Sequence, residues 1–162
     1  MALTHGPFDM LYDEHQMLTR LFALHQEALL DRDWDRARRL LEHYCSLMQR
    51  HIEIEDRFLL APRETPAVGM RWTDEVYRAE HRRIMLLLAR LIERMMRVVQ
   101  RSVKPAGLIA LLDQERSLKH LLEHHHHREE IALFNEKRRT LPAETRAALS
   151  RALAEAAAST AA

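Results

Sequence analysis

The sequence predicts an all-α fold, an antiparallel up-down-up-down four-helix bundle followed by a short fifth helix. Four long stretches carry apolar residues at helical spacing. The chain has only three glycines and five prolines, and helix-forming Leu, Ala, Arg, Glu and Met are abundant. Short connections between long helices favour neighbours that run in opposite directions. With 162 residues, 47% of them hydrophobic, the chain is long enough to bury one sizeable core.

Helix-capping and helix-breaking residues separate the predicted helices. The segment DRDWD offers capping aspartates after the first, prolines precede a capping Thr73 at the third, and Pro105 opens the fourth. A fifth, peripheral helix over 143–158 follows a proline. We therefore expect a four-helix bundle over 1–140 and a C-terminal helix with its tail over 141–162. The four long helices are predicted at residues 7–30, 34–60, 73–101 and 106–137.

Composition argues against several classes of partner. The formal net charge is +1, with 25 basic and 24 acidic residues interspersed, so no nucleic-acid or membrane partner is indicated. The longest apolar run, 84–99, is interrupted by arginines and a glutamate, which argues against a membrane-spanning helix. The single cysteine, Cys45, cannot form an internal disulfide and fits a reducing compartment. We expect a cytoplasmic protein.

A weak internal duplication organises the histidines. EHQMLTRLF (14–22) resembles EHRRIMLLL (80–88), and each is followed later by His-x-x-x-Glu, as HIEIE (51–55) and as HHREE (126–130). The internal position of the run HHHH, with 35 residues after it, argues against a purification tag.

Helical projection at about 100° per residue places one histidine near the centre of the apolar stripe of each helix. In the fourth helix His126 is central, His125 and His127 lie at the stripe edges, and His120 and His124 face solvent, where they could bind a surface cation with His127. All four central histidines lie about 12 to 15 Å from the helix ends that share one side of the bundle. One layer should therefore combine four imidazoles and two carboxylates: His15, His51, His81, His126, Glu55 and Glu130.

Such a layer would be costly without a cation. Buried carboxylates need a countercharge, and imidazoles need partners for both ring nitrogens. Imidazole and carboxylate donors without a thiolate suit iron, manganese or zinc. Bundle cores built from Glu and His on facing helices are known to hold two-iron sites. The sequence therefore predicts a metal-binding layer.

The ordered pattern EH, HxxxE, EH, HxxxE over about residues 8–137 resembles the hemerythrin-like family, also called the HHE cation-binding domain. The resemblance implies a non-heme di-iron centre with two iron ions, terminal histidine ligands and bridging Glu55 and Glu130. Oxygen-carrying hemerythrins have a fifth histidine one turn before the third-helix ligand, where this chain has Tyr77. Their last carboxylate follows its histidine by five residues, so His125 with Glu130 is a competing assignment. Tyr77 is an additional candidate ligand, and Glu129 and Glu80 are candidates to orient a ligand imidazole.

The resemblance implies a protein that reacts with or senses O2, peroxide or nitric oxide, and the missing histidine weighs against reversible oxygen binding of the carrier type. Whether it is an enzyme stays open. Two other hypotheses are a metal-storage or metal-sensing module without turnover and a metal-free helical interaction domain. A homodimer formed through the fifth helix or the 61–72 loop is also left open.

Overall fold

The computed structural model describes residues 5–60, 72–99 and 104–160, and every secondary-structure element in these ranges is helical. The five predicted helices are confirmed, with one difference: the fourth is divided by a π-helical turn. The expected 61–72 loop, apart from Trp72, and the expected end of the third helix at residue 101 lie outside the described residues. The elements are α1 Pro7–Leu30, α2 Trp34–Phe58, α3 Asp74–Val99, α4 Pro105–Arg128, η1 Glu129–Leu133, α5 Phe134–Thr140 and α6 Ala143–Thr160.

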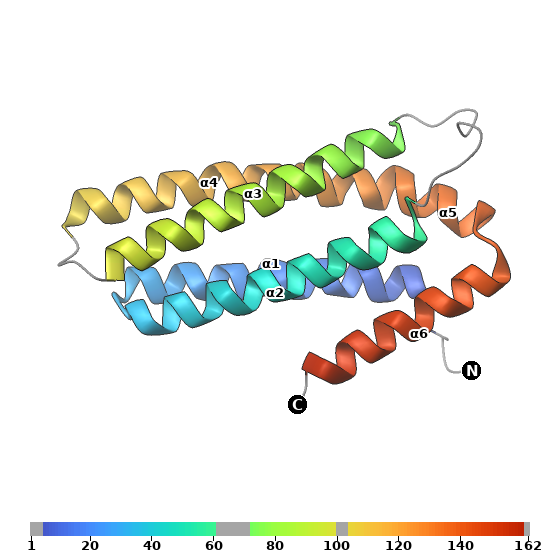
Figure 1. The fold of residues 1–162 in the computed structure, drawn as a ribbon, viewed down its shortest axis with the longest axis horizontal. Helices are drawn as coiled ribbons and strands as arrows, with labels where there is room; N and C mark the ends of the chain where they lie inside the picture. The colour runs from blue at the N-terminus through green and yellow to red at the C-terminus, as the bar shows by residue number, and fades with distance from the viewer. Residues whose placement is uncertain (1–4, 61–71, 100–103, 161–162) are drawn as a thin grey trace.

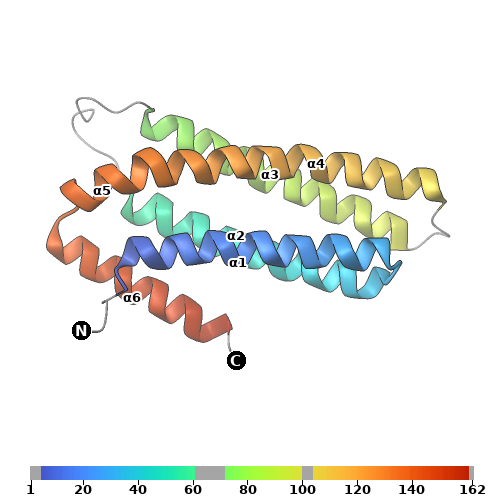
Figure 2. The same ribbon diagram turned by 180° about the vertical axis from the view of Figure 1, so that it is seen from behind.

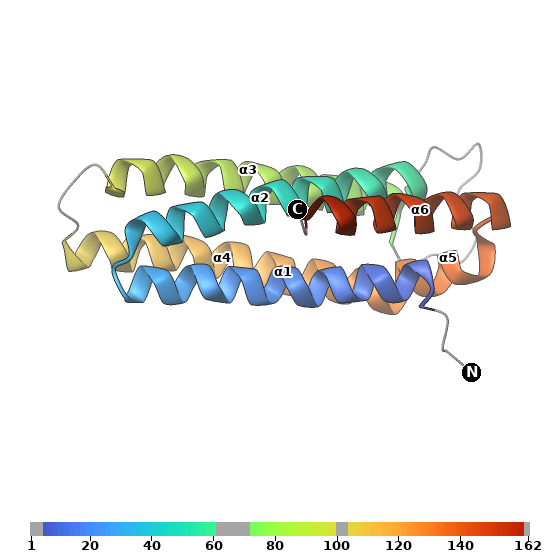
Figure 3. The same cartoon turned by 90° about the horizontal axis from the view of Figure 1, so that it is seen from below.

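Helices α1 to α4 lie lengthwise beside one another as a bundle (Figure 1 and, from behind, Figure 2). In this bundle α1 packs on α2, α2 on α3 and α3 on α4, and α1 also contacts α4. Helix α5 extends beyond α4, and α6 turns back along one end of the bundle, where it packs on α1 and α2 (Figure 3). Within the described ranges, no helix is long and apolar enough to cross a membrane.

Local sequence explains two of the helix ends. Asp33 caps α2, because its side chain accepts a 3.0 Å hydrogen bond from the backbone N–H of Arg36. Pro105 is the first residue of α4, where its missing N–H costs no hydrogen bond. Between α1 and α2, Arg32 adopts the left-handed conformation with φ 58°, and Asp33 N–H closes the turn onto Ala28 O at 2.9 Å.

Two apolar clusters fill the bundle, one on each side of a buried polar layer. The first includes Leu18, Tyr44, Ile84, Leu88 and Leu118. The second includes Leu11, Ile54, Tyr77, Leu133 and Phe134 together with Leu149 and Leu153 of α6. Because α6 contributes buried leucines to the second cluster, the predicted peripheral helix closes one end of the core.

A separate buried polar pair lies inside the first cluster. His25 and Glu115 are both fully buried, and their side chains are joined by a 2.8 Å contact between His25 Nε2 and Glu115 Oε1. His25 Nδ1 donates to Ala37 O at 2.7 Å, and Gln26 donates to Glu115 Oε2 at 3.0 Å. All polar atoms of the pair thus have partners, which supports the structural role expected for a satisfied core histidine.

Candidate metal centre

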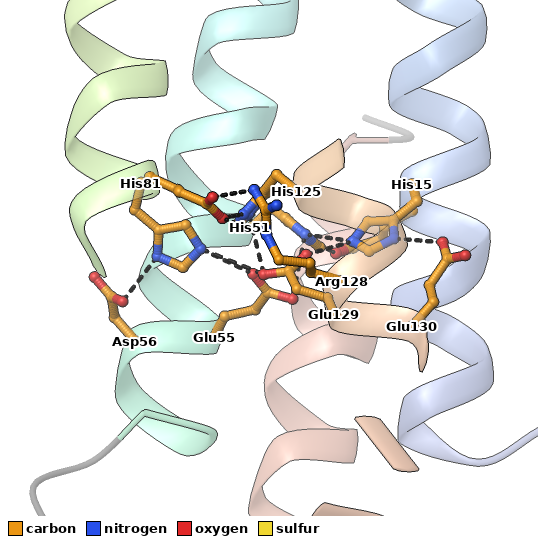
Figure 4. Close-up of polar contacts among 11 residues, drawn as sticks. His15, His51, Glu55, Asp56, His81, His125, Arg128, Glu129 and Glu130 are labelled. Atoms are coloured by element: carbon orange, nitrogen blue, oxygen red, sulfur yellow. Dashed lines mark hydrogen bonds and ion pairs between the residues drawn. The ribbon is translucent and has the colours of Figure 1, made fainter. Parts of the chain in front are cut away.

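Each long helix contributes one histidine to the buried polar layer. His15 lies on α1, His51 on α2, His81 on α3 and His125 on α4, and each is at most 2% exposed. Two fully buried carboxylates lie among them: Glu55, one turn after His51, and Glu129, one turn after His125. Figure 4 shows these side chains converging from the four helices.

The inner atoms form two groups of four donors. Position A consists of His15 Nε2, His51 Nε2, Glu55 Oε1 and Glu129 Oε2. In position A the two ring nitrogens are 3.1 Å apart. Glu55 Oε1 is 3.5 Å from His51 Nε2, and Glu129 Oε2 is 3.4 Å from His15 Nε2.

Position B uses the other oxygen of each carboxylate. It consists of His81 Nε2, His125 Nε2, Glu55 Oε2 and Glu129 Oε1. Glu55 Oε2 is 3.5 Å from His81 Nε2. Glu129 Oε1 is 3.4 Å from His81 Nε2 and 3.0 Å from His125 Nε2. Both carboxylates therefore extend one oxygen toward each position, as bridging ligands between two ions would.

Four carboxylates on the outer side of the layer accept hydrogen bonds from the four imidazoles. Each Nδ1–H donates to one of these carboxylates, here called the outer carboxylates, over 2.8 to 2.9 Å: His15 to Glu130, His51 to Glu14, His81 to Asp56 and His125 to Glu80. Because Nδ1 carries the proton, each neutral imidazole turns its Nε2 lone pair inward. Carboxylate–histidine pairs of this kind fix the tautomer and the orientation of metal-binding histidines.

Every outer carboxylate stands next in sequence to an inner side chain. Glu14 precedes His15 and Glu80 precedes His81, whereas Asp56 follows Glu55 and Glu130 follows Glu129. The repeat is thus Glu-His followed by His-x-x-x-Glu-acid in each half of the chain. The two halves interlock, because Asp56 holds a histidine of the second half and Glu130 holds one of the first.

In the protein chain alone, the layer attracts protons. Burial acts to lower the pKa of His15, but its hydrogen bonds to Glu129 and Glu130 outweigh burial and raise the pKa to about 10. Burial also acts to lower the pKa of His81, but the carboxylates of Asp56, Glu129 and Glu55 outweigh it and raise the pKa to about 11. Burial acts to raise the pKa of Glu129, yet the surrounding histidines, His125 foremost, hold it well below its usual value. The layer therefore favours positive charge.

The donors fit a pair of metal ions. Donor atoms that are each about 2.1 Å from one ion lie about 3.0 to 3.4 Å apart at bond angles between 90° and 109°. Three separations in each position are 3.0 to 3.5 Å, and all four donor atoms of each position lie within 4.8 Å of one another. Neutral His15 and His51 would face each other with two bare lone pairs at 3.1 Å, which repel unless a cation or proton lies between them. Both oxygens of Glu55 are buried without a hydrogen-bond partner, which is costly unless a cation binds them.

Four of the six residues expected in the layer are brought together: His15, His51, His81 and Glu55. Of the other two, His126 has a ring nitrogen within 4.8 Å of those of His15 and His51 but belongs to neither position A nor position B. Glu130 is 27% exposed and accepts from the outer Nδ1 of His15, so Glu129 occupies the inner place expected for it. His125, the competing assignment, faces positions A and B, but its partner one turn later is Glu129 and not Glu130.

The π-helical turn and a buried glutamate explain this difference. The sequence-based helical projection assumed one regular helix over 106–137. In the structure a π-helical turn, η1, begins at Glu129, and the backbone N–H of Phe134 donates to the carbonyl oxygen of Glu129. Because a π-helical turn holds more residues than an α-helical turn, the direction in which Leu133 points does not indicate the direction of the residues before it. The buried positions of α4 also include Glu115, which a count of apolar residues omits. With Glu115 included, the buried face runs through residues 111, 115, 118, 122, 125 and 129, and it therefore contains His125. An additional signal was present in the repeat, because Asp56 follows Glu55 as Glu130 follows Glu129.

Three further side chains adjoin the layer. Arg128 pairs with Glu80, so a guanidinium reaches the outer carboxylates. Tyr77 is fully buried and its hydroxyl has no hydrogen-bond partner; burial raises the pKa of this phenol, which keeps it protonated. His126 is 9% exposed and stacks on His15. Burial, followed by the charge of His15, lowers the pKa of His126 to about 2.

Comparisons of the chain with models of known protein families, with curated proteins and with solved structures find no match. The geometry of the layer is therefore the basis for the function proposed below.

Proposed function

We propose that this chain is a non-heme di-iron protein of hemerythrin-like type that reacts with or senses O2, peroxide or nitric oxide. The observation that carries the proposal is that Glu55 and Glu129 each direct one carboxylate oxygen toward position A and the other toward position B. An isolated buried salt bridge does not require this arrangement, whereas two ions held as a pair do. The proposed frame is an antiparallel up-down-up-down bundle in a cytoplasmic protein.

The proposed ligands differ from those the family resemblance suggested. His15 and His51 would hold one ion and His81 and His125 the other, with Glu55 and Glu129 shared between both. These donors are imidazoles and carboxylates, which suit iron and leave manganese and zinc as alternatives. Bound iron would supply redox electrons and open coordination positions for a small ligand.

The chain's own side chains would perform three tasks. The outer carboxylates orient the imidazoles and make them stronger donors. The two apolar clusters on either side of the layer exclude water. The buried phenol of Tyr77, one turn before His81, lies where oxygen carriers have a fifth histidine, and its unpaired hydroxyl supports a role as a hydrogen-bond donor or additional ligand near position B.

Anaerobic iron loading tests the proposal. We expect uptake of about two iron ions per chain, measured by metal analysis, with Mössbauer spectra of a coupled pair after oxidation. Exposure to O2, peroxide and nitric oxide then separates the outcomes: a persistent adduct indicates sensing or binding, and catalytic loss of peroxide indicates an enzyme. Uptake without any spectral response would indicate storage or metal sensing, and no uptake would indicate a metal-free interaction domain.

A matched pair of variants makes the test specific. Glu55→Gln removes a shared carboxylate and should weaken both positions. Glu53→Gln changes an exposed carboxylate on the same helix, which contacts only Gln49 among the described hydrogen bonds, and should leave iron uptake unchanged. Equal uptake by the two variants would contradict a bridging role for Glu55.

A further inference from the structure

His126 is a buried polar side chain that the ligand groups of positions A and B do not use. Its ring stacks on that of His15, with 3.9 Å between centroids and 7° between planes. Its Nε2 is buried and has no hydrogen-bond partner. One ring nitrogen of each of His15, His51 and His126 nevertheless lies within 4.8 Å of the other two. The His126 ring, with its unpaired Nε2, therefore borders position A.

The stacking argues against His126 as a third ligand of the same ion. An imidazole binds a metal along a lone pair that lies in the plane of its ring. Two nearly parallel rings direct their lone pairs along parallel planes, so His15 and His126 cannot converge on one ion without a change of rotamer. His126 Nε2 is instead available to a molecule bound beside position A.

A small cavity is lined in part by His126. Its volume is about 50 Å³, and its walls include Thr19, Phe22, Tyr44 and Leu122. A cavity needs roughly 10 to 15 Å³ to admit one water molecule, so this space admits a diatomic or triatomic ligand. Lys119 and Glu123 line it as well and are exposed, which connects the cavity to the surface between α1 and α4.

We infer that His126 separates this cavity from position A and donates a hydrogen bond from Nε2 to small ligands that reach the metal there. The ligand class is a diatomic or triatomic molecule or anion with an acceptor atom at its free end, such as peroxide, O2 or azide. This inference rests on the proposed function, since it requires an occupied position A. It assigns the ligand-binding side of the centre to the α1 and α4 face.

Azide titration of the oxidised, iron-loaded chain tests the assignment, followed by optical spectroscopy. His126→Leu removes the donor, and the loss of one hydrogen bond should weaken azide binding about 5- to 10-fold. His126→Gln, which keeps an N–H donor, should lose less. His127→Leu, an exposed neighbour in the same run, should bind azide as the unchanged chain does.

A cavity variant tests the route independently of the hydrogen bond. Thr19→Leu places more bulk at the cavity wall, so azide association and dissociation should both slow several-fold while the equilibrium affinity stays within about 2-fold. Unchanged rates in this variant would contradict the cavity as the route.

Metal analysis of the same samples separates the remaining outcomes. All three histidine variants should keep the full iron complement. Loss of iron in His126→Leu would show that His126 is a ligand, and unchanged azide affinity would show that it has no contact with the bound molecule; either result overturns this inference alone. Absence of iron from the unchanged chain would instead contradict the proposed function, and this inference with it.

Discussion

Glu14 Oε2 accepts a 2.8 Å hydrogen bond from His51 Nδ1, so a residue of α1 fixes the ring of a histidine on α2. The contact recurs with other residues at each histidine of the layer. Interhelical contacts of this kind orient the ring nitrogens before any ion arrives, and preorganised ligands bind more tightly than mobile ones.

Removal of Glu14 should weaken metal binding without removing a ligand. We expect Glu14→Leu to lower the iron affinity of position A about 10- to 100-fold, the usual effect of losing a partner of a ligand histidine. Competition with a chelator measures the affinity. Glu27→Gln, an exposed carboxylate change on the same helix, is the control. Equal affinity of the two variants would mean that His51 needs no partner.

Substitutions in the histidine run should distinguish the two assignments for α4. His125→Ala should reduce bound iron from about two ions to about one per chain, because position B loses a nitrogen donor while position A keeps both of its own. Glu129→Gln should weaken both ions. Glu130→Gln should retain both at reduced affinity, since it acts through His15. If Glu130→Gln lost iron and Glu129→Gln kept it, the ligand pair would be the one first expected from the sequence.

The stability of the chain should depend on pH in opposite ways with and without iron. In the metal-free chain the folded pKa values of His15 and His81 are raised from 6.5 to about 10 and about 11. Their stabilising contribution is fully present below the unfolded value of 6.5 and is lost as pH rises through 10 and 11. Ligand histidines must be neutral, so iron should be lost as pH falls through about 6 to 5.

Thermal unfolding of both forms between pH 4.5 and 10 measures this difference. The increase in Tm caused by iron should grow from pH 6 to pH 9, because metal-free stability declines while binding strengthens. A constant increase across that range, or full retention of iron at pH 4.5, would contradict histidine-dominated ligation.

The buried pair of His25 and Glu115 should matter for stability and not for iron. Glu115→Ala leaves His25 and Gln26 without their partner, and breaking a buried pair from one side costs about 3 to 5 kcal/mol. The double variant His25→Leu with Glu115→Leu removes both polar groups and should be less destabilised. Urea unfolding gives the free energies. A larger loss of stability in the double variant would mean that the pair itself is strongly stabilising.

The sequence predicts the helices and most of the layer because both depend on local, periodic information. His15, His51 and His81 lie mid-stripe on regular helices, so a constant angle per residue places them correctly. The same angle holds within α4 but fails beyond it, where η1 changes the number of residues per turn at Glu129. That change is a tertiary outcome, since it brings both Leu133 and Phe134 into the core.

Polar side chains account for the remaining differences. Glu115 and Arg128 are charged, so a count of apolar residues passes over both, yet Glu115 is buried against His25 and Arg128 pairs with Glu80. Such contacts join residues that are far apart in the chain, and hydrophobic periodicity carries no information about them. The outer carboxylates were only partly anticipated for the same reason, although their places beside the inner residues in both halves gave a readable signal.

The most direct measurement is anomalous scattering at the iron edge from crystals of the iron-loaded chain. The proposed centre predicts two peaks about 3.5 to 4 Å apart, one beside His15 and His51, the other beside His81 and His125, with Glu55 and Glu129 between them. A single peak, a peak at the exposed His120 and His124, or none within the bundle would contradict a dinuclear centre.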